Sequence, residues 1–308
     1  MVDLVILGGG PAGVSAAVYA ARKKIQSVLV TDSFGGQSIV SEDIQNWIGT
    51  PHISGAQLAQ NLEAHAREYA GTVLEIRDKT RVIDVQQGTD SFLVHIQKKG
   101  SEVEYIETKT VLVTTGSIRR KLQAIGADTF EHKGLTYCAS CDGPFFAEQD
   151  VIVVGGGNAG LESALQLSAY CKKVYIFNRT ETFRGDEITL ESVKKKANIE
   201  LVINAAIDEI HGTQFVESVT YTQAGVQKKM NVEGIFVEIG QEPNTSYVKN
   251  IVDTTPSGNI KVDPRTQRTS VLGIWAAGDC TDGLYHQNNI ACGDAVKALE
   301  DIYVWLQR

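Results

Sequence analysis

The chain has 308 residues, with 29 lysine and arginine residues against 37 aspartate and glutamate residues, and a formal net charge of −8 at pH 7. This length suits one large domain or two ordinary ones, and an acidic chain without a basic run argues against a nucleic-acid-binding role. No stretch approaches eighteen consecutive apolar residues, so we predict no contact with a membrane. The five cysteines, mostly scattered, and a start without a secretory leader indicate a cytoplasmic protein.

The first thirty residues have the pattern of a nucleotide-binding unit. A short apolar run at 4–7 is followed by GGGPAG at 8–13 and by small residues that predict a helix. In Gly-x-Gly-x-x-Gly the first glycine permits a tight turn, the second lets a pyrophosphate approach the backbone, and the third lets helix and strand pack closely. The residues expected to face the phosphates are Gly8, Gly10, Pro11, Ala12 and Gly13.

The next segment adds groups that suit a ribose and a flat ring. Asp32 follows the predicted strand 28–31, where a carboxylate accepts hydrogen bonds from an adenosine ribose. Gly36, in the pair of glycines at 35–36, allows the backbone to lie against a ring. The side chains of Gln37 and Asn46 can hydrogen-bond the polar edge of that ring. This combination suits a flavin. Farther on, alternating residues around Lys99-Gly100 predict a β-hairpin.

YCASCDGPFF at 137–146 places two cysteines two residues apart and an acid after the second. A zinc site needs about four ligands, usually as two such pairs, and the remaining cysteines stand singly. A structural disulfide across so short a loop contributes little chain entropy. We therefore predict that Cys138 and Cys141 form a redox-active pair and that no metal is bound. Cys171, Cys280 and Cys292 are expected to be small buried residues.

The glycine pattern returns at 155–160 as GGGNAG, again between an apolar run and a predicted helix. Two copies in the same setting are stronger evidence than one, and the second predicts nucleotide contacts from Gly155, Gly157, Asn158 and Gly160. A third strand and glycine turn come at 273–280, GIWAAGDC. There Gly278 and Asp279 are placed to bind a ribityl hydroxyl, and Gln287 begins a helix whose N-terminus can face a ring.

These motifs occur in the same order in the low-molecular-weight thioredoxin reductases, which the sequence resembles over essentially its whole length. The chain is also similar to the C-terminal part of the flavoprotein subunit of alkyl hydroperoxide reductase, at FGGQ, EAHAREY and GIFVEIGQEPNT. The resemblance implies an α/β protein with two Rossmann-like three-layer domains, the second inserted into the first. The FAD-binding domain is then 1–116 with 244–308, and 117–243 is an NAD(P)H-binding domain that carries the cysteine pair.

The resemblance also implies roles for the matching residues. Cys141 corresponds to the thiol nearest the flavin, Cys138 to the thiol that attacks the substrate disulfide, and Asp142 to the acid that protonates the departing thiolate. Asp142 also fits a turn residue before Gly143-Pro144. The implied enzyme is a homodimer that passes electrons from FAD through the cysteine pair to a thioredoxin or thioredoxin-like protein.

The electron donor is left open by the sequence. Thioredoxin reductases of this type bind the 2′-phosphate of NADPH through a His-Arg-Arg cluster and one further arginine. The matching positions here are Asn178, Arg179, Thr180 and Arg184. The two arginines favour NADPH, whereas the alkyl hydroperoxide reductase resemblance favours NADH. A third alternative uses no pyridine nucleotide and covers the flavin with a C-terminal aromatic residue, for which Tyr303 and Trp305 are available, although their spacing favours a helix packed on its core.

Three other functions stay open beside the thioredoxin reductase interpretation. The first is an NADH-dependent reductase of a peroxiredoxin system. The second is a dithiol oxidase that runs the same cysteine chemistry in reverse with oxygen. The third is not an enzyme but a flavin redox sensor, in which the cysteine pair changes shape without turnover.

Overall fold

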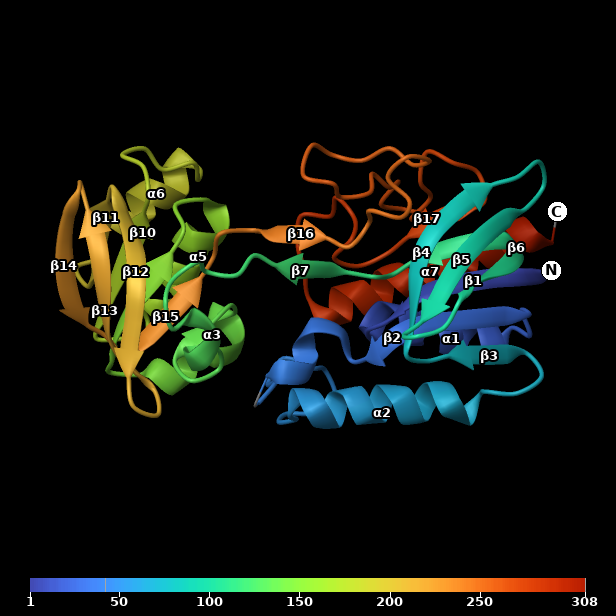
Figure 1. Ribbon diagram of the computed structural model, residues 1–308, viewed down its shortest axis with the longest axis horizontal. Helices are drawn as coiled ribbons and strands as arrows, with labels where there is room; N and C mark the ends of the chain where they lie inside the picture. The colour runs from blue at the N-terminus through green and yellow to red at the C-terminus, as the bar shows by residue number, and fades with distance from the viewer. Residues whose placement is uncertain (42, 308) are drawn as a thin grey trace. The chain divides into compact units, whose positions relative to one another are not determined.

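A computed structural model describes residues 1–41 and 43–307, and its chain forms two compact units (Figure 1). Unit 1 comprises Met1–Ile118 and Glu242–Arg308, and unit 2 comprises Arg119–Gln241. In Figure 1 unit 1 holds the blue and red ends of the chain and unit 2 holds its green to yellow middle. These limits lie two residues from the expected ones, at 118 instead of 116 and at 242 instead of 244.

Unit 1 is built on one sheet in the order β3-β2-β1-β6-β5-β4, with β17 also paired to β6. β1 runs parallel to both neighbours, β2 and β6, while β4, β5 and β6 form antiparallel hairpins. The strands are β1 (Val2–Gly9), β2 (Ser27–Phe34), β3 (Leu74–Arg77), β4 (Thr80–Gln87), β5 (Phe92–Lys98), β6 (Val103–Val113) and β17 (Ile274–Ala276). The helices are α1 (Pro11–Arg22), η1 (Gly36–Val40), α2 (Gly55–Glu68) and α7 (Asn288–Leu306).

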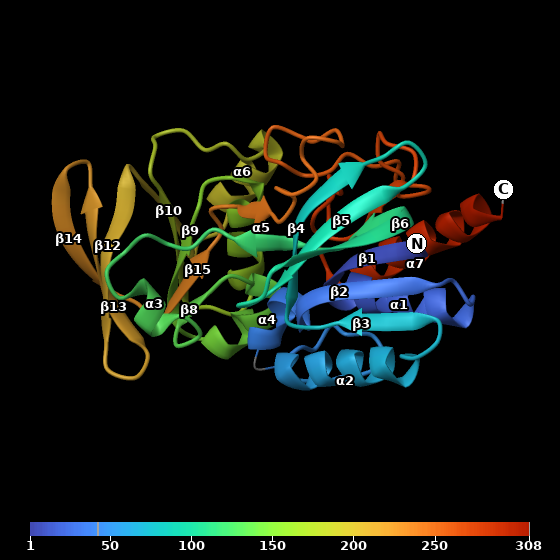
Figure 2. The ribbon, with the colours of Figure 1, turned by 45° about the vertical axis from the view of Figure 1, so that its right-hand side comes forward.

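Unit 2 has a parallel sheet in the order β11-β10-β9-β15-β8 and an antiparallel sheet β12-β13-β14 (Figure 2). The strands are β8 (Leu135–Thr136), β9 (Asp150–Val154), β10 (Lys173–Asn178), β11 (Ile199–Ile203), β12 (Ala205–Gly212), β13 (Val216–Gln223), β14 (Val226–Asn231) and β15 (Gly234–Val237). The helices are α3 (Ala127–Phe130), α4 (Ala139–Asp142), η2 (Gly143–Phe146), α5 (Asn158–Leu167) and α6 (Glu187–Lys194). The two connections between the units pair as strands β7 (Ser117–Arg119) and β16 (Gln241–Pro243).

The central strand of each unit is buried on both faces. In β1, Leu4 and Ile6 pack with α1 and α7, whereas Val5 and Leu7 pack on the opposite side of the sheet. In β9, the side chains of residues 151–154 divide in the same way between two apolar clusters. Parallel strands covered on both faces read as continuous apolar runs, which is the pattern seen in the sequence. The predicted fold class, α/β with two Rossmann-like domains, is confirmed.

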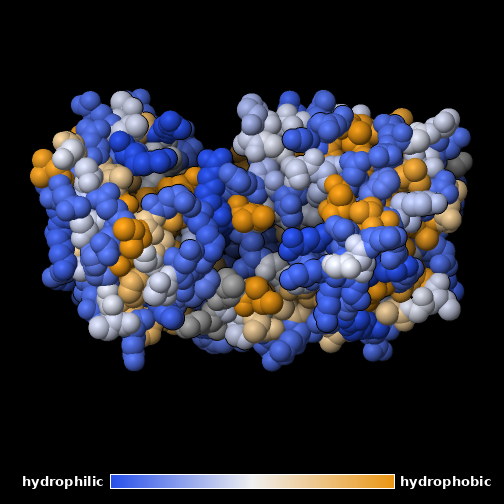
Figure 3. Space-filling model, viewed as in Figure 1, coloured by the Kyte–Doolittle hydropathy of each residue, from blue (hydrophilic) through white to orange (hydrophobic). Residues whose placement is uncertain are grey.

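Apolar side chains on the surface are scattered among polar ones. On the face shown in Figure 3, hydrophilic residues predominate and hydrophobic residues form separate small groups. Among the described residues no helix combines the length and the apolar character needed to cross a membrane.

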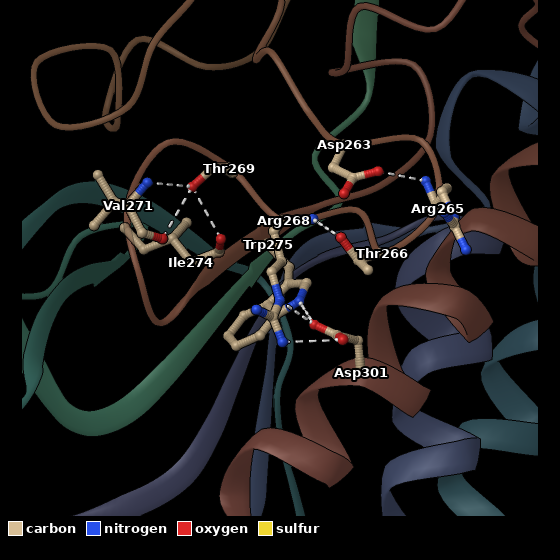
Figure 4. Close-up of polar contacts among 9 residues, drawn as sticks. All are labelled: Asp263, Arg265, Thr266, Arg268, Thr269, Val271, Ile274, Trp275 and Asp301. Carbon is tan, nitrogen blue, oxygen red and sulfur yellow. Dashed lines mark hydrogen bonds and ion pairs between the residues drawn. The ribbon is translucent and has the colours of Figure 1, made fainter.

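The segment before β17 is held in place by a carboxylate on α7 (Figure 4). Asp301 accepts hydrogen bonds from Arg268 Nε at 2.5 Å and from the second guanidinium nitrogen at 3.1 Å. It also accepts one from the indole Nε1 of Trp275 at 2.9 Å. Trp275 is only 1 % exposed, so this carboxylate satisfies a buried donor as well as a cation. The contacts fix β17, which leads to the glycine turn at Gly278.

We expect Asp301→Ala to lower the free energy of unfolding of unit 1 by about 2 kcal/mol, because it leaves the buried indole N–H and the guanidinium without their acceptor. Glu300→Ala is the matched control, since Glu300 makes an exposed ion pair with Lys23 and such pairs contribute under about 1 kcal/mol. Urea unfolding followed by tryptophan fluorescence measures both, since the chain's three tryptophans all lie in unit 1. Equal losses in the two variants would contradict the assignment.

Candidate active site

The glycine turn of unit 1 joins β1 to α1 with a different geometry at each glycine. Gly8 has φ +117°, a conformation that side chains rarely adopt. A Cβ on Gly13 would overlap the carbonyl oxygen of Gly8, so this glycine allows the helix to pack on the turn. A Cβ on Gly10, by contrast, would have its nearest neighbour 3.8 Å away, at Gly36 Cα. The backbone in front of α1 is therefore open, as a bound pyrophosphate requires.

Unit 2 repeats this turn between β9 and α5. Gly155 has φ +136°, and a Cβ on Gly160 would overlap the carbonyl oxygen of Gly155. A Cβ on Gly157 would meet no atom within 4 Å. Both turns thus leave open space at the second glycine and tight packing at the third. Each ends at the N-terminus of a helix, where free N–H groups and the helix dipole favour an anion.

Segments far apart in sequence meet at the first glycine turn. A Cβ on Gly278 would lie 3.2 Å from Ala291 Cβ and 3.5 Å from Ala12 Cβ, so the closing segment lies against the first turns of α1 and α7. Gly36 lies beside Gly10, since a Cβ on Gly36 would be 3.5 Å from Gly10 Cα. Glycines from three segments therefore form a glycine-rich region at the start of α1, which fits a cofactor with a pyrophosphate and a flat ring.

Polar side chains lie close to this glycine-rich region. Asn46 donates to Gln287 at 3.1 Å, so two residues predicted separately are in contact. Gln37 donates to Ser117 at 3.1 Å. His286 Nε2 is buried and has no hydrogen-bond partner among the described residues. Buried polar atoms are normally paired, so an orphaned one here fits a site that a polar cofactor completes.

Asp32 is placed differently from the expectation. β2 extends to Phe34, so Asp32 lies within the strand and not after its end. Its exposed carboxylate is bound by Arg81 of β4, at 2.9 Å from Nε and 2.7 Å from a terminal nitrogen. The predicted strand end was wrong because β2 continues past the apolar run at 28–30 to a second buried apolar residue, Phe34. Binding of a ribose by Asp32 stays a prediction and would compete with this ion pair.

Cys138 and Cys141 are joined by a disulfide at the short helix α4. Cys138 caps the helix, and its Sγ accepts a hydrogen bond from the backbone N–H of Cys141 at 3.2 Å. Both cysteines are half-buried. A donor directed at Cys138 Sγ favours the charged form of this sulfur once the disulfide is open, which is the form that attacks another disulfide.

The residues around the disulfide are fixed by neighbours in unit 2. Asp142 accepts a hydrogen bond from the hydroxyl of Thr136, the last residue of β8. Ser140, between the cysteines, donates to Gln166 of α5 at 2.9 Å. Phe145, just beyond, is 54 % exposed. Asp142 is therefore oriented by Thr136 close to the sulfur pair, where a carboxylic acid can exchange a proton.

The segment after β10 folds back over the second glycine turn. The backbone N–H groups of Arg184 and Gly185 donate to Gly156 O, at 2.8 and 3.2 Å. Asn158 bonds Asp186 twice: its Oδ1 accepts from the Asp186 N–H at 2.7 Å and its Nδ2 donates to the carboxylate at 3.0 Å. Sequence reasoning missed Asp186, for which the signal was only an acid at the start of α6.

Asn178, at the end of β10, is turned inward. Its amide donates to the carbonyl oxygens of Thr180 and Thr182, both at 2.9 Å, and a Cβ on Gly156 would overlap it. Arg179 and Arg184 are exposed, and across residues 1–41 and 43–307 their side chains make no ion pair or hydrogen bond. The segment after β10 therefore carries two exposed guanidinium groups, on Arg179 directly after the strand and on Arg184 five residues further along, while Asn178 stabilises the turn.

A family model described as pyridine nucleotide-disulphide oxidoreductase matches residues 2–295. The chain belongs to the pyridine nucleotide-disulphide oxidoreductase family. Its fold is also that of a thioredoxin reductase from Giardia duodenalis, with a TM-score of 0.90, 30% sequence identity and coverage of 100% of this chain and 99% of that one. The family model and this structure confirm the predicted resemblance and imply FAD, which the open glycine turn of unit 1 fits.

Two curated relatives match nearly the whole chain. One is named "NADH dehydrogenase", from Bacillus subtilis (strain 168), 36% identical over 308 residues, which are 99% of this chain and 59% of the relative. The other, from Xanthomonas campestris pv. phaseoli, is named as a subunit of alkyl hydroperoxide reductase and is 36% identical over 299 residues, 96% of this chain and 55% of the relative. The chain thus spans less than two thirds of the length of either relative.

The C-terminal aromatic residues of this family member pack on unit 1. The rings of Trp275 and Trp305 meet edge to face, with centroids 5.9 Å apart, and Lys23 Nζ lies 4.4 Å from the ring centroid of Tyr303. Tyr303 and Trp305 lie near the C-terminal end of α7, whereas Gln287 precedes its N-terminal end. At about 1.5 Å per residue, a helix of this length separates them from the start of α7 by more than about 20 Å within one chain.

The remaining cysteines are not alike. Burial raises the pKa of the Cys171 thiol to about 11 and that of Cys280 to about 12, which keeps both protonated at neutral pH. Cys292 is only half-buried, so the expectation that it is buried was wrong. Its Sγ lies 3.5 Å from the carbonyl oxygen of Pro11, because α7 packs against α1 beside the glycine turn.

Proposed function

We propose that the chain is an FAD-dependent disulfide reductase that passes electrons from a pyridine nucleotide to the Cys138–Cys141 pair and on to a thioredoxin or thioredoxin-like protein. One observation supports this most directly: a cysteine pair already joined as a disulfide shares a unit with one open glycine turn, and a second open turn lies in the other unit. The 30% identity to the Giardia duodenalis thioredoxin reductase supports the same substrate class.

Bound FAD supplies the two-electron chemistry that links a nucleotide to a disulfide. The chain's own residues then carry the exchange. Cys138, once reduced, attacks a sulfur of the substrate disulfide, the first substrate thiolate leaves, and Cys141 attacks Cys138 to release the second. Asp142, oriented by the hydroxyl of Thr136, is the group placed to give a proton to the leaving thiolate. The products are a dithiol substrate and a restored Cys138–Cys141 disulfide.

NADPH is the donor we propose, because the segment after β10, where a 2′-phosphate would bind, carries two exposed arginines. We expect Arg179→Ala and Arg184→Ala each to weaken NADPH binding by roughly tenfold and to leave NADH binding within about twofold. Lys194→Gln on α6 is the control for loss of a positive charge elsewhere on unit 2. Equal weakening of NADPH and NADH would show that the arginines do not contact the 2′-phosphate.

Anaerobic titration of the yellow protein with NADPH and then NADH, followed at the flavin absorbance, tests the donor. Turnover with a thioredoxin disulfide then tests the acceptor. Fast bleaching by NADPH together with thioredoxin reduction supports the proposal. Bleaching by dithionite alone would eliminate both nucleotides, and dithiol consumption with peroxide formation in air would indicate a dithiol oxidase. Flavin reduction without turnover of any disulfide would indicate the sensor alternative.

The second candidate is an NADH-dependent reductase of a peroxiredoxin system, favoured by the Xanthomonas relative named for alkyl hydroperoxide reduction. Bleaching by NADH alone and no thioredoxin turnover would select it. A homodimer and a cytoplasmic location are further proposals carried over from the thioredoxin reductase resemblance. Sedimentation of the purified protein tests the first, against a chain mass of 33.4 kDa.

A further inference from the structure

Glu238 lies beside the second glycine turn, at the carboxyl edge of the parallel sheet. β15 ends at Val237, which pairs with Val154 at the end of β9. The Glu238 N–H donates to Val154 O at 2.8 Å, and a Cβ on Gly155 would overlap the Glu238 carbonyl oxygen. Dinucleotides bind outside this edge in sheets of this kind, where the strand order reverses. Glu238 therefore borders the place where unit 2 would hold its nucleotide.

The strand order shows which half of the nucleotide Glu238 would face. β9 has β10 on one side and β15 on the other. The adenosine ribose meets the strand that follows the fingerprint helix, here β10, and the pyrophosphate lies at the helix N-terminus. A nucleotide extended across the edge then places its nicotinamide beyond β9 on the β15 side. Glu238 directly follows β15 on this side of the sheet.

The carboxyl group of Glu238 is half-buried and is held by Ser163 of α5. Its Oε1 accepts a hydrogen bond from Ser163 Oγ at 2.8 Å. Burial raises the pKa of Glu238 to about 7; the Ser163 bond and the positive charge of Arg119 act against this, while the negative charge of Glu162 adds to it. Both protonation states are therefore present near neutral pH.

We propose that Glu238 discriminates between the two redox states of the pyridine nucleotide, its carboxylate favouring the cationic oxidised nicotinamide and its protonated form the neutral reduced one. The inference rests on the proposed function, in which unit 2 binds a pyridine nucleotide. A carboxylate in a partly buried setting attracts a nearby cationic ring more strongly than it would in water. Because the group ionises as pH rises through its pKa, the preference for the oxidised form grows in the same direction.

Isothermal titration calorimetry of the oxidised, FAD-loaded 308-residue chain between pH 5.5 and 8.5 tests this proposal. The two ligands are NADP⁺ and 1,4,5,6-tetrahydro-NADP, a reduced-ring analogue that cannot donate hydride. They carry the same phosphates, so the pH dependence of the ratio of their dissociation constants reports the response to the charge of the ring. We expect this ratio to shift towards NADP⁺ by roughly five- to tenfold from pH 6 to 8.5, as follows from about one unit of linked pKa change. In Glu238→Gln it stays constant.

Substitution of two neighbours of Glu238 should shift the pH at which the ratio changes. A purely structural role of Glu238 would not produce such shifts. Ser163→Ala removes a hydrogen bond to the ionised form, so the midpoint of the transition moves to higher pH. Glu162→Gln removes a negative charge, so the midpoint moves to lower pH. A constant ratio in the unaltered protein, or the same profile in Glu238→Gln, overturns this inference alone. Failure of both NADP and NAD ligands to bind at every pH overturns the proposed nucleotide donor together with it.

Discussion

We expect replacement of Cys138 or Cys141 by serine to lower the proposed reduction of a thioredoxin disulfide by roughly a thousandfold or more. The two sulfurs act as one unit, because each electron pair needs both of them to change between disulfide and dithiol. The structure holds the two cysteines at one short helix. The Cys141 N–H donates a hydrogen bond to Cys138 Sγ, and the Thr136 hydroxyl donates one to the Asp142 carboxylate. Without either sulfur, the second thiol–disulfide exchange, which releases the substrate and restores the Cys138–Cys141 disulfide, does not take place. No neighbouring hydrogen bond compensates for the lost thiol.

The two variants are distinguishable by what they trap. Cys141→Ser keeps the proposed attacking thiol and accumulates a mixed disulfide with thioredoxin, visible on a non-reducing gel, whereas Cys138→Ser does not. Cys171→Ala is the matched control, since that thiol is buried and kept protonated, and it retains activity. The reverse trapping pattern would exchange the roles of Cys138 and Cys141. Full activity in either serine variant would remove the pair from the mechanism.

The fold was predictable because its signals are local. The apolar runs at 4–7 and 151–154 are strands buried on both faces, and the glycine at the start of each turn is needed for a positive φ that other residues rarely adopt. The helices then begin where Pro11 and Asn158 stand, directly after these turns. Each of these features depends on neighbours in sequence, so a single chain contains enough information to locate them.

The site was less predictable because its side chains depend on distant partners. Asp32 has its ion pair with Arg81, and Asn178 is turned inward by the backbone of a turn that follows it. Glu238 occurs in the stretch GIFVEIGQEPNT, where nothing in the sequence shows that it will be half-buried against Ser163. Periodicity gives the strand, but the direction and solvation of one carboxyl group come from the packing of other elements.

We expect Gly157→Val to lose the pyridine nucleotide and keep FAD, and Gly10→Val to lose FAD and keep the pyridine nucleotide. At both positions the structure has room for a Cβ, and φ is −92° at Gly157 and −76° at Gly10, so the new side chain needs no strained backbone. Its methyl groups occupy the space in front of the helix N-terminus, where a pyrophosphate must lie against the backbone. We expect Gly157→Val to weaken NADPH binding by roughly a hundredfold or more, and Gly10→Val to purify without flavin.

The two glycine variants distinguish the nucleotide sites of the two units, because each variant is the control for the other. Gly157→Val should stay yellow and be reduced by dithionite but not by NADPH, while Gly10→Val should still bind NADP⁺ in a calorimeter. Circular dichroism and urea unfolding show whether either variant has lost its fold. If Gly157→Val is still bleached by NADPH at the normal concentration, the nucleotide does not cross α5, and neither the arginines after β10 nor Glu238 after β15 can then have the proposed roles. A single substitution in open space therefore tests the whole geometry of unit 2.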